Sequence, residues 1–495
     1  MIAGCRPLAE KTKAVPVLVR LRPVIGAGGF ILLLVLLAML RPVDHDESQY
    51  VAATVLAASG LPYRDFAYFQ TPLQPLLLAP IAMLGGQWTW PALRLINTFF
   101  GIITLISCYG AARAGGARQS IAIAATMLFA SCDIFLYTAA IARNDALPAA
   151  CLSVALWLHL RRPGHQRSPL AAMLTGALLA TAAATKISFA IPAIAYGVYA
   201  LAHRGNRPGL VAVGVAPIAV AVFGLYLAAP DAFVFDVFTF AVRAPIEWYR
   251  QANPWKLTLL AKAIDAIKFL LLGPAFLALL MLARSRVKPA RASLLIILTL
   301  AGLVGALLPS PTWRQYLIPV LPPLFVWLAL AWEAQPPDRA WRVAMIVCAA
   351  AGWAPTIEGI LLGGNRMTIA QAMRESAIIG QAASAVGVAG PVASLAPQLL
   401  PGAGLTIDPR FAAGPYYFRS DHLLNDVQER ALHLVSRRRM NVMTPLPAAV
   451  LIGGEGPWAG SDTDELPILE DYLRSNRWRR VPMPSERFRL YLPPQ

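Results

Sequence analysis

The chain of 495 residues carries a formal net charge of +17, yet only 14 % of its residues are charged and 57 % are hydrophobic. Soluble domains have about a quarter charged residues, and the mean hydropathy of +0.56 indicates a polytopic membrane protein instead. The basic residues form short clusters between apolar runs, without a nucleic-acid-binding motif. The positive charge therefore reflects membrane topology and excludes nucleic acid as the expected partner.

Apolar runs predict eleven membrane spans, with the N-terminus in the cytoplasm and the C-terminus outside. A helix needs about 20 residues to cross the bilayer. The predicted spans are 24–40, 91–112, 119–138, 146–160, 169–185, 187–203, 208–229, 260–283, 291–309, 315–334 and 341–361. No small-residue cleavage site follows the first run, so we expect it to stay attached as a membrane helix.

The distribution of charge supports this topology. Segments predicted to face the cytoplasm are short and basic, such as RRPGHQR and RSRVKPAR. Segments predicted to face outside carry most acids and aromatic residues, and they are 41–90, 139–145, 230–258 and 362–495. A further apolar stretch, 72–84, is predicted to lie at the membrane interface, because counting it as a span would reverse the alternation.

The sequence predicts two domains, a membrane domain over 1–362 and a small α/β domain outside the membrane over 363–495. After Gly363, charges of both signs return, and Pro and Gly separate short apolar runs such as PVASLA and AAVLIGG. Such runs are typical of short strands, and we expect a helix over His422–Val435. The glycine cluster at 453–456 is expected to be a turn. The fold class is thus an α-helical polytopic membrane protein with an added α/β domain.

The stretch RPVDHDESQY, residues 41–50, follows the first predicted span directly and holds three acids and a histidine. One reading is a helix start, in which Asp44 or Asp46 caps a helix that continues to Ala58. Gln49 would then complete a capping box with Asp46. Capping requires only one acid, however, so the cluster favours an active-site loop with capping as a secondary role.

Other polar residues lie at helix ends on the same predicted outer face. These residues are Arg143, Asn144, Asp145, Lys186, Arg243, Arg314 and Tyr316. Each alone is compatible with an anchor at the membrane surface, but their shared face favours a functional site. A carboxylate can accept a proton from an attacking hydroxyl. Cations and a tyrosine hydroxyl can bind a leaving phosphate and stabilise its charge.

This pattern resembles the GT-C glycosyltransferases, in the branch that contains the protein O-mannosyltransferases and the bacterial lipid A aminoarabinose transferase. The DExxY-like run of that branch is matched by Asp46-Glu47-Ser48-Gln49-Tyr50. The other matches, in chain order, are GLPYRDF at 60–66 with Pro72, Arg143-Asn144-Asp145, Thr185-Lys186-Ile187 and Tyr316-Leu317-Ile318-Pro319. The resemblance covers about residues 25–335, and every match lies on the predicted outer face.

The resemblance implies an inverting glycosyltransferase of the bacterial inner membrane. It would move a sugar from a polyprenyl-phosphate donor to a periplasmic or cell-envelope acceptor, which is a glycolipid, a polysaccharide or a protein. Asp46 would be the general base, and Glu47 and Asp145 would orient the acceptor or support Asp46. The implied donor-phosphate ligands are Lys186, Arg243, Arg314 and Tyr316. Candidate acceptor or loop contacts are Asp44, His45, Tyr50, Tyr63, Arg64, Gln70 and Arg143.

The sequence also departs from the family pattern. Gln70-Thr71-Pro72 stands where the aminoarabinose transferase has an acid and a lysine before the proline. We therefore predict no zinc site, and the same donor sugar and lipid A acceptor are not implied by default. Asp44, His45 and Asp46 could bind a divalent ion, but side chains at adjacent positions should point apart. A solvated turn is expected, and no cofactor is predicted.

Two other classes of protein remain open. A secondary transporter or flippase should have acids near the bilayer midplane and an internal repeat. The predicted spans are uncharged at their centres, and only Asp265 and Lys268 come close, where their spacing predicts a mutual ion pair. A non-catalytic assembly protein that has kept the fold is harder to exclude, although retention of Asp46 and Asp145 argues against it. The sequence favours the transferase.

Overall fold

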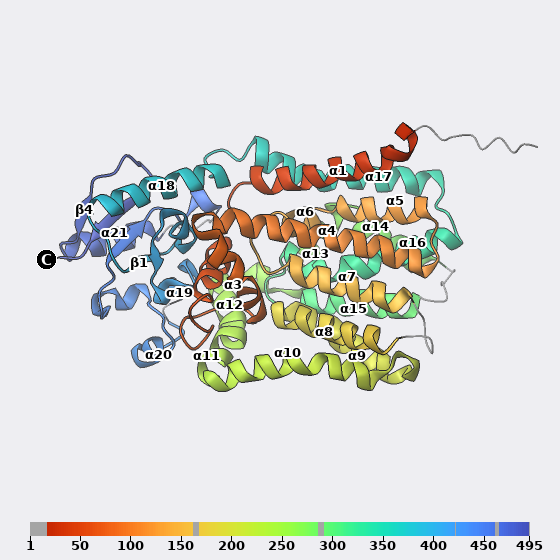
Figure 1. Cartoon of the computed structure of the whole chain (residues 1–495), viewed down its shortest axis with the longest axis horizontal. Helices are drawn as coiled ribbons and strands as arrows, with labels where there is room; N and C mark the ends of the chain where they lie inside the picture. Colours follow the sequence, from red (N-terminus) through yellow and green to blue (C-terminus); the bar gives the residue numbers. More distant parts are fainter. Residues whose placement is uncertain (1–16, 162–167, 286–291, 421, 461–464, 495) are drawn as a thin grey trace, which may run out of the picture.

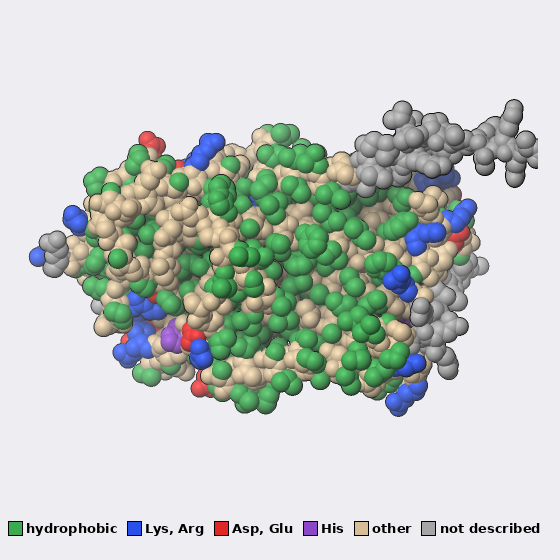
Figure 2. Space-filling view, viewed as in Figure 1, with side chains coloured by type: hydrophobic (Ala, Val, Ile, Leu, Met, Phe, Trp, Pro, Cys, Tyr) green, Lys and Arg blue, Asp and Glu red, His purple; other side chains and the backbone are tan. Residues whose placement is uncertain are grey.

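The computed structural model describes residues 17–161, 168–285, 292–420, 422–460 and 465–494 (Figure 1). A long bundle of helices forms most of the molecule, and a smaller part with a β-sheet adjoins one end of it (Figure 1). Hydrophobic side chains cover most of the visible bundle surface, while charged side chains gather toward the two ends (Figure 2). A bilayer surrounds a helical protein with this distribution of side chains.

The predicted spans coincide closely with helices of the bundle. These helices are α1 (Val17–Leu40), α4 (Thr89–Gly115), α5 (Gln119–Ala130), α6 (Asp133–Thr138), α7 (Ala146–Arg161), α8 (Pro169–Thr185), α9 (Ala190–Ala202), α10 (Pro208–Ala228), α13 (Leu259–Leu271), α14 (Ala275–Arg284), α15 (Ala292–Leu307), α16 (Leu321–Ala334) and α17 (Arg339–Leu361). Hydrocarbon offers backbone groups no hydrogen-bond partners, so apolar runs form helices there.

Among the described residues, four helical stretches are long and apolar enough to cross a membrane, and a bent pair would be a fifth. Six further apolar helices are shorter, with 10–17 residues each. Together they make the chain a multi-pass membrane protein, while the number of eleven full spans stays a prediction. The interfacial stretch forms α3 (Leu73–Gly85), which continues through a single 3-10 turn into α4.

Two of the predicted spans are not continuous helices. The 119–138 run breaks between α5 and α6, and the 260–283 run bends by 100° between α13 and α14. The two breaks meet, because Asp133 N donates to Leu272 O at 2.9 Å. Gly273 permits this close approach, since it has φ +129° and a Cβ at its position would lie 2.7 Å from Cys132 Cα.

The predicted ion pair between Asp265 and Lys268 is also wrong. Asp265 instead pairs with Lys256, whose Nζ lies 2.8 Å from Asp265 Oδ2. Lys256 belongs to the 3-10 turn Pro254–Leu257, which immediately precedes α13. The loop folds back onto the helix, and so places a cation nearer to Asp265 than the next helical turn does.

The C-terminal part contains a five-stranded sheet of order β2-β1-β3-β5-β4. The strands are β1 (Pro391–Ser394), β2 (Thr406–Ile407), β3 (Ala449–Ile452), β4 (Arg479–Val481) and β5 (Arg489–Leu492). β1 runs parallel to β2 and β3, with Ala393 opposite Val450, and β5 runs antiparallel to β3 and β4. The strands predicted in PVASLA and AAVLIGG are thereby confirmed.

Helices flank this sheet, with α18 (Ile369–Ala385) before it and α21 (Leu466–Ser475) between β3 and β4. The glycines at 453–456 form a bend after β3, as predicted. The helix predicted over His422–Val435 is wrong in extent, because only α20 (Asp426–Ala431) is helical there. Asn425 caps α20 through the backbone N–H groups of residues 427 and 428, and this capping fixes the late start.

The C-terminal part lies directly on the end of the bundle that carries the Asp44–Glu47 loop. Val43 N donates to Met367 O at 2.7 Å. The short helix α19 (Pro415–Phe418) lies near α2 (Glu47–Leu56), and Gly414 packs against Ser48. Residues far apart in the sequence therefore meet at this end, which we call the outer end of the bundle.

Candidate active site

The Asp44–Glu47 loop is held by its own backbone and side chains rather than by a capping box. Asp46 precedes α2, but its side chain caps no N–H group, so the capping box predicted with Gln49 is wrong. Instead, Asp46 N donates to Asp44 Oδ1, and Asp44 N donates to Glu47 Oε2, both at 3.0 Å. This arrangement leaves the Asp46 carboxylate available for contacts outside α2.

Glu47 is a buried structural anchor. Its side chain is 0 % exposed and forms an ion pair with Arg94 of α4 at 2.5 Å. It also accepts hydrogen bonds from Trp90 Nε1 at 3.1 Å and from Ala142 N at 2.8 Å. These contacts tie three segments together, namely α2, α4 and the loop after α6. Glu47 thus anchors the start of α2, next to Asp46, and its own carboxylate is enclosed by these partners.

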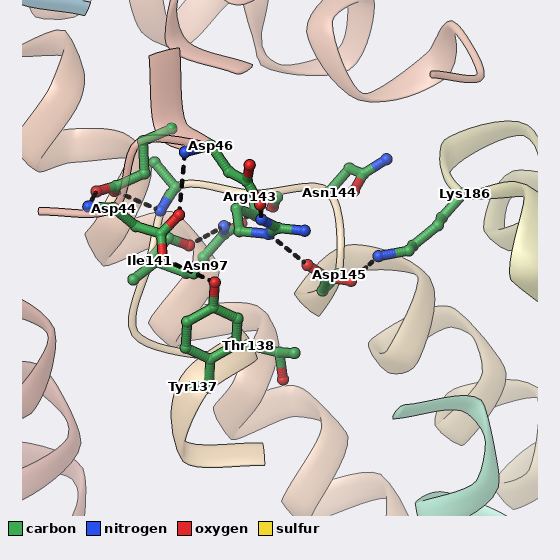
Figure 3. A network of polar contacts seen from close by, with 12 residues as sticks. Asp44, Asp46, Asn97, Tyr137, Thr138, Ile141, Arg143, Asn144, Asp145 and Lys186 are labelled. Carbon is green, nitrogen blue, oxygen red and sulfur yellow. Dashed lines mark hydrogen bonds and ion pairs between the residues drawn. The ribbon is translucent and has the colours of Figure 1, made fainter. Parts of the chain in front are cut away.

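Asp46 begins a chain of alternating charges that runs into the bundle (Figure 3). Arg143 forms ion pairs with Asp46 and, at 3.1 Å, with Asp145, and Asp145 in turn pairs with Lys186. Burial opposes the charge on Arg143, but Asp145 and Asp44 outweigh it and raise the pKa of that guanidinium. The Asp46 side chain is 22 % exposed, whereas Asp145 is 0 % exposed. Asp46 is thus the most exposed member of this chain of charges.

A second branch of the network starts at Asp44. The Tyr137 hydroxyl donates to Asp44 Oδ2 at 2.8 Å (Figure 3). The Arg314 guanidinium lies 3.5 Å from the centre of the Tyr137 ring and pairs with Asp133 at 3.0 Å. Burial alone would raise the pKa of Asp44, but the charges of Arg143 and Arg314 and the hydrogen bond from Tyr137 hold it below its ordinary value. Asp44 is therefore ionised at neutral pH.

His45 completes a compact cluster with the two aspartates. Its Nε2 lies 3.3 Å from Asp46 Oδ1, and one ligand atom from each of Asp44, His45 and Asp46 lies within 4.8 Å of the others. The expectation that these adjacent side chains point apart is therefore wrong. Burial lowers the pKa of His45, so the imidazole is neutral at pH 7. The charge of Asp46 is already balanced by Arg143, so the cluster alone assigns no metal.

Tyr416 is the contact that the sequence did not reveal. It belongs to α19 of the C-terminal part, and its hydroxyl donates to Asp46 Oδ1. Burial raises the pKa of Tyr416, so the hydroxyl stays protonated and remains a donor. No motif marks this residue, because it lies 370 positions from its partner.

The structure brings together most of the other predicted site residues. Lys186 Nζ lies 5.4 Å from the centre of the Tyr316 ring. The Arg143 guanidinium lies 5.5 Å from the centre of the Tyr50 ring. Asn144 Nδ2 donates to Gln70 Oε1 at 3.2 Å. The matched motifs of the sequence therefore converge around Asp46 and Asp145.

Three predicted residues lie apart from this cluster. Arg243 is exposed on α12 (Ala241–Ala252), where it pairs with Glu247 at 3.2 Å. Arg64 is exposed and pairs with Asp65 at 2.7 Å. Tyr63 is buried, and its hydroxyl donates to Gln70 O at 2.6 Å. Of the three, Tyr63 shapes the loop that holds Gln70, and none contacts Asp46.

Sequence reasoning also missed several buried partners of the site. Arg94 and Asp133 are single charges inside predicted spans, and Arg41 follows the first span directly. A lone charge within an apolar run is costly unless it is paired. That rule could have identified Arg94 and Asp133 from the sequence, and each of them has an ion-pair partner.

The fold and site define a multi-pass membrane protein whose polar centre lies at one end of a helical bundle. Two crystal structures of ArnT from Cupriavidus metallidurans, one without ligand and one bound to undecaprenyl phosphate, share this architecture. Each match covers 96 % of this chain and 100 % of that chain, with a TM-score of 0.63 and 16 % identity. The chain therefore shares the fold of these structures, which is the GT-C fold that the sequence resemblance predicts.

Other comparisons match parts of the chain. The family model for dolichyl-phosphate-mannose-protein mannosyltransferases matches residues 69–233. The arabinofuranosyltransferase AftD from Mycobacteria matches 76 % of this chain and 29 % of its own, with 20 % identity and a TM-score of 0.48. No curated protein sequence matches the chain.

Proposed function

We propose that the chain is an inverting glycosyltransferase that uses a polyprenyl-phosphate-linked sugar. The acceptor is a periplasmic or cell-envelope glycolipid, polysaccharide or protein. The observation that carries this proposal is the difference in exposure among the acids. Asp46 is partly exposed at 22 %, while Glu47 and Asp145 are 0 % exposed. Of these three acids, Asp46 is thus the one presented to substrates, and Glu47 and Asp145 hold it in place.

In this reaction Asp46 is the general base. It accepts the proton of the acceptor hydroxyl as that oxygen attacks the anomeric carbon of the sugar. The bond from the anomeric carbon to the phosphate oxygen breaks, and polyprenyl phosphate leaves with the bonding electrons. Arg143 and the Tyr416 hydroxyl orient the Asp46 carboxylate. Asp145 positions both Arg143 and Lys186.

Lys186, Tyr316 and Arg314 are proposed to bind the donor phosphate. Lys186 and Tyr316 lie together beside Asp145, and Arg314 lies on the Asp44 side. Cations and tyrosine hydroxyls stabilise the charge that grows on a leaving phosphate. Arg243 does not belong to this group, because it lies on exposed α12 with Glu247 as its partner.

The proposed location is the bacterial inner membrane, with the N-terminus in the cytoplasm. Residues 1–362 form the membrane domain, and 363–495 form a periplasmic domain over Asp46. The supporting observation is the set of arginines at the opposite helix ends, which consists of Arg113, Arg118, Arg161, Arg204, Arg284 and Arg339. Such a cluster is typical of the cytoplasmic side.

Release of polyprenyl phosphate tests the proposal. Membranes that contain the chain and polyprenyl-phosphate sugars radiolabelled in the polyprenyl chain should accumulate labelled polyprenyl phosphate over time. Membranes that contain Asp46→Asn at the same protein level should keep the label in the sugar-bearing donor. Asp231→Asn is the matched control, because Asp231 is an exposed acid away from the site. Equal release by wild type and Asp46→Asn would refute the role of Asp46.

A further inference from the structure

A cavity of about 340 Å³ lies beside the Asp44–Glu47 loop. Its polar lining consists of Arg41, Asp44, Tyr137, Arg314, Glu358 and Arg366. Cavities of this size are typical of ligand sites. Three guanidinium groups and two carboxylates line it, so the lining carries one more positive than negative charge. The cavity therefore favours an anion.

Arg41 gives the clearest sign of a missing partner. Its residue is only 8 % exposed, and Nη1 donates to Leu136 O and Thr356 Oγ1, both at 3.3 Å. The guanidinium also lies 5.0 Å from the centre of the Tyr137 ring. Within the described part of the chain, no carboxylate lies within ion-pair distance of it. A buried cation with only neutral partners is costly, and an anionic ligand would offset that cost.

Arg366 and Arg314 complete the cationic lining. Arg366 is exposed and has no ion-pair partner among the residues that the structure describes. Arg314 has one, Asp133, and its guanidinium also lies 3.5 Å from the centre of the Tyr137 ring. Guanidinium groups bind phosphate oxygens through paired N–H donors, which gives them both affinity and orientation.

The remaining wall of the cavity is apolar and belongs to a membrane helix. It is formed by the outer end of α17, with Pro355, Gly359 and Leu362. Leu361 and Leu362 are 73 % and 77 % exposed, and Leu40 at the end of α1 is 50 % exposed. Exposed aliphatic side chains at the end of a membrane helix contact lipid chains. A ligand in this cavity can thus place an anionic group among the arginines and a hydrocarbon chain in the bilayer.

We propose that this cavity binds the phosphate group of a membrane lipid substrate, whose hydrocarbon chain lies along the outer ends of α1 and α17. The inference rests on the proposed function and adds the side from which a lipid meets Asp46. Two lipids would supply the same chemistry, the polyprenyl-phosphate donor and a phosphorylated lipid acceptor. The arginines recognise the phosphate in either case.

Lipid binding to the purified full-length protein tests the inference. Dissociation constants are measured by native mass spectrometry for two probes, undecaprenyl phosphate and phosphatidic acid. The Arg41→Gln and Arg366→Gln variants should bind at least one probe about 10-fold more weakly, the loss expected for a charged hydrogen bond. Arg250→Gln should bind like wild type, since Arg250 is exposed on α12 outside the cavity.

The pattern of loss distinguishes the two sources. Weaker binding of undecaprenyl phosphate alone assigns the cavity to the donor, and weaker binding of phosphatidic acid alone assigns it to a phosphorylated acceptor. Weaker binding of both supports a general lipid-phosphate site. Unchanged binding of both probes overturns the inference. Arg366 is exposed, so its variant should fold even if Arg41→Gln does not.

Binding does not require transfer, so this inference and the proposed function fail separately. Asp46→Asn should bind the probes as wild type does, because Asp46 does not line the cavity. If Asp46→Asn transfers sugar normally while Arg366→Gln loses binding, the base assignment fails and the lipid site stands. If Arg366→Gln binds both lipids normally while Asp46→Asn loses transfer, the lipid site fails and the base stands.

Discussion

Four acids near the outer end of the bundle have different environments, and these environments separate their roles. Glu47 and Asp145 are fully buried and form ion pairs with Arg94 and Lys186, so their charges are balanced by partners within the protein. Asp46 keeps part of its surface exposed, and Asp44 faces the arginine-lined cavity. The sequence places all four on one face, but only burial shows which of them can reach a substrate.

Glu47→Gln is expected to damage folding more than chemistry. The change leaves the buried Arg94 without an anionic partner, which costs about 3–5 kcal/mol. Thermal unfolding in detergent should therefore occur at a clearly lower temperature, whereas Asp46→Asn should unfold close to wild type. A Glu47→Gln protein that melts normally and yet has no activity would place Glu47 in the reaction itself.

Tyr416→Phe is expected to slow transfer and leave folding intact. The substitution keeps the ring and removes the hydroxyl that donates to Asp46. Loss of one hydrogen bond to a charged group costs about 1.5–3 kcal/mol, which corresponds to a rate reduced about 10- to 100-fold. Initial rates and melting temperatures measured side by side check this. If the rate is unchanged, the C-terminal part does not take part in orienting the base.

Asp236 should make stability depend on pH. It lies in the outer loop, and burial raises its pKa to about 8, although Tyr68 N donates to it. The folded state thus holds the proton more tightly than the unfolded state. Stability is fully present below the unfolded pKa of about 4 and declines as pH rises toward 8. Melting temperatures between pH 5 and 9 should fall, and Asp236→Asn should remove that decline. A wild type with a flat profile would contradict this.

At the scale of elements, irregular helix ends build the site. α2, α4 and the loop after α6 are joined through Glu47, and the breaks of α5–α6 and α13–α14 meet beside Asp133. Hydropathy located these helices well, because a long apolar run is enough to predict a membrane helix. It did not locate the breaks, because they depend on close backbone contacts between segments distant in sequence.

Gly273→Ala is expected to destabilise the fold at this junction. The residue has φ +129°, and an added Cβ would lie 2.7 Å from Cys132 Cα. Backbone strain of this kind costs about 1–3 kcal/mol, before the steric clash is added. Gly224→Ala is the control, since nothing lies within 4 Å of its Cβ position in α10. Thermal melting of the two variants should differ clearly. Equal melting temperatures would show that the junction adapts easily.

At the scale of the molecule, two parts of the chain meet at one polar centre. The sequence predicted the bundle, the strands of the C-terminal part and the group formed by Asp46, Arg143, Asp145 and Lys186. It could predict that group because its members lie at helix ends on the same face. It could not predict Tyr416 or Arg41 as neighbours of the centre, since their positions follow from how the C-terminal part and α17 pack on the outer end.

This assembly also bears on the alternative of a transporter. The ion pairs among Asp46, Arg143, Asp145 and Lys186 lie at the outer end of the bundle, as does the pair between Arg314 and Asp133. A transporter of the repeat-built class needs its binding groups near the midplane of the membrane. The C-terminal part contacts Asp46 through Tyr416, and this contact agrees with the proposed enzyme that acts at the membrane surface.

The most direct measurement compares the cell-envelope glycans of cells that express wild type, Asp46→Asn or Asp231→Asn at equal levels. Mass spectrometry of glycolipids, polysaccharides and glycoproteins reads out the sugar and the acceptor together. We predict that one envelope molecule lacks one sugar in Asp46→Asn cells and keeps it in the other two. Identical envelopes in all three strains, with the protein folded in the membrane, would contradict the assignment of Asp46 as the base of a glycosyltransferase.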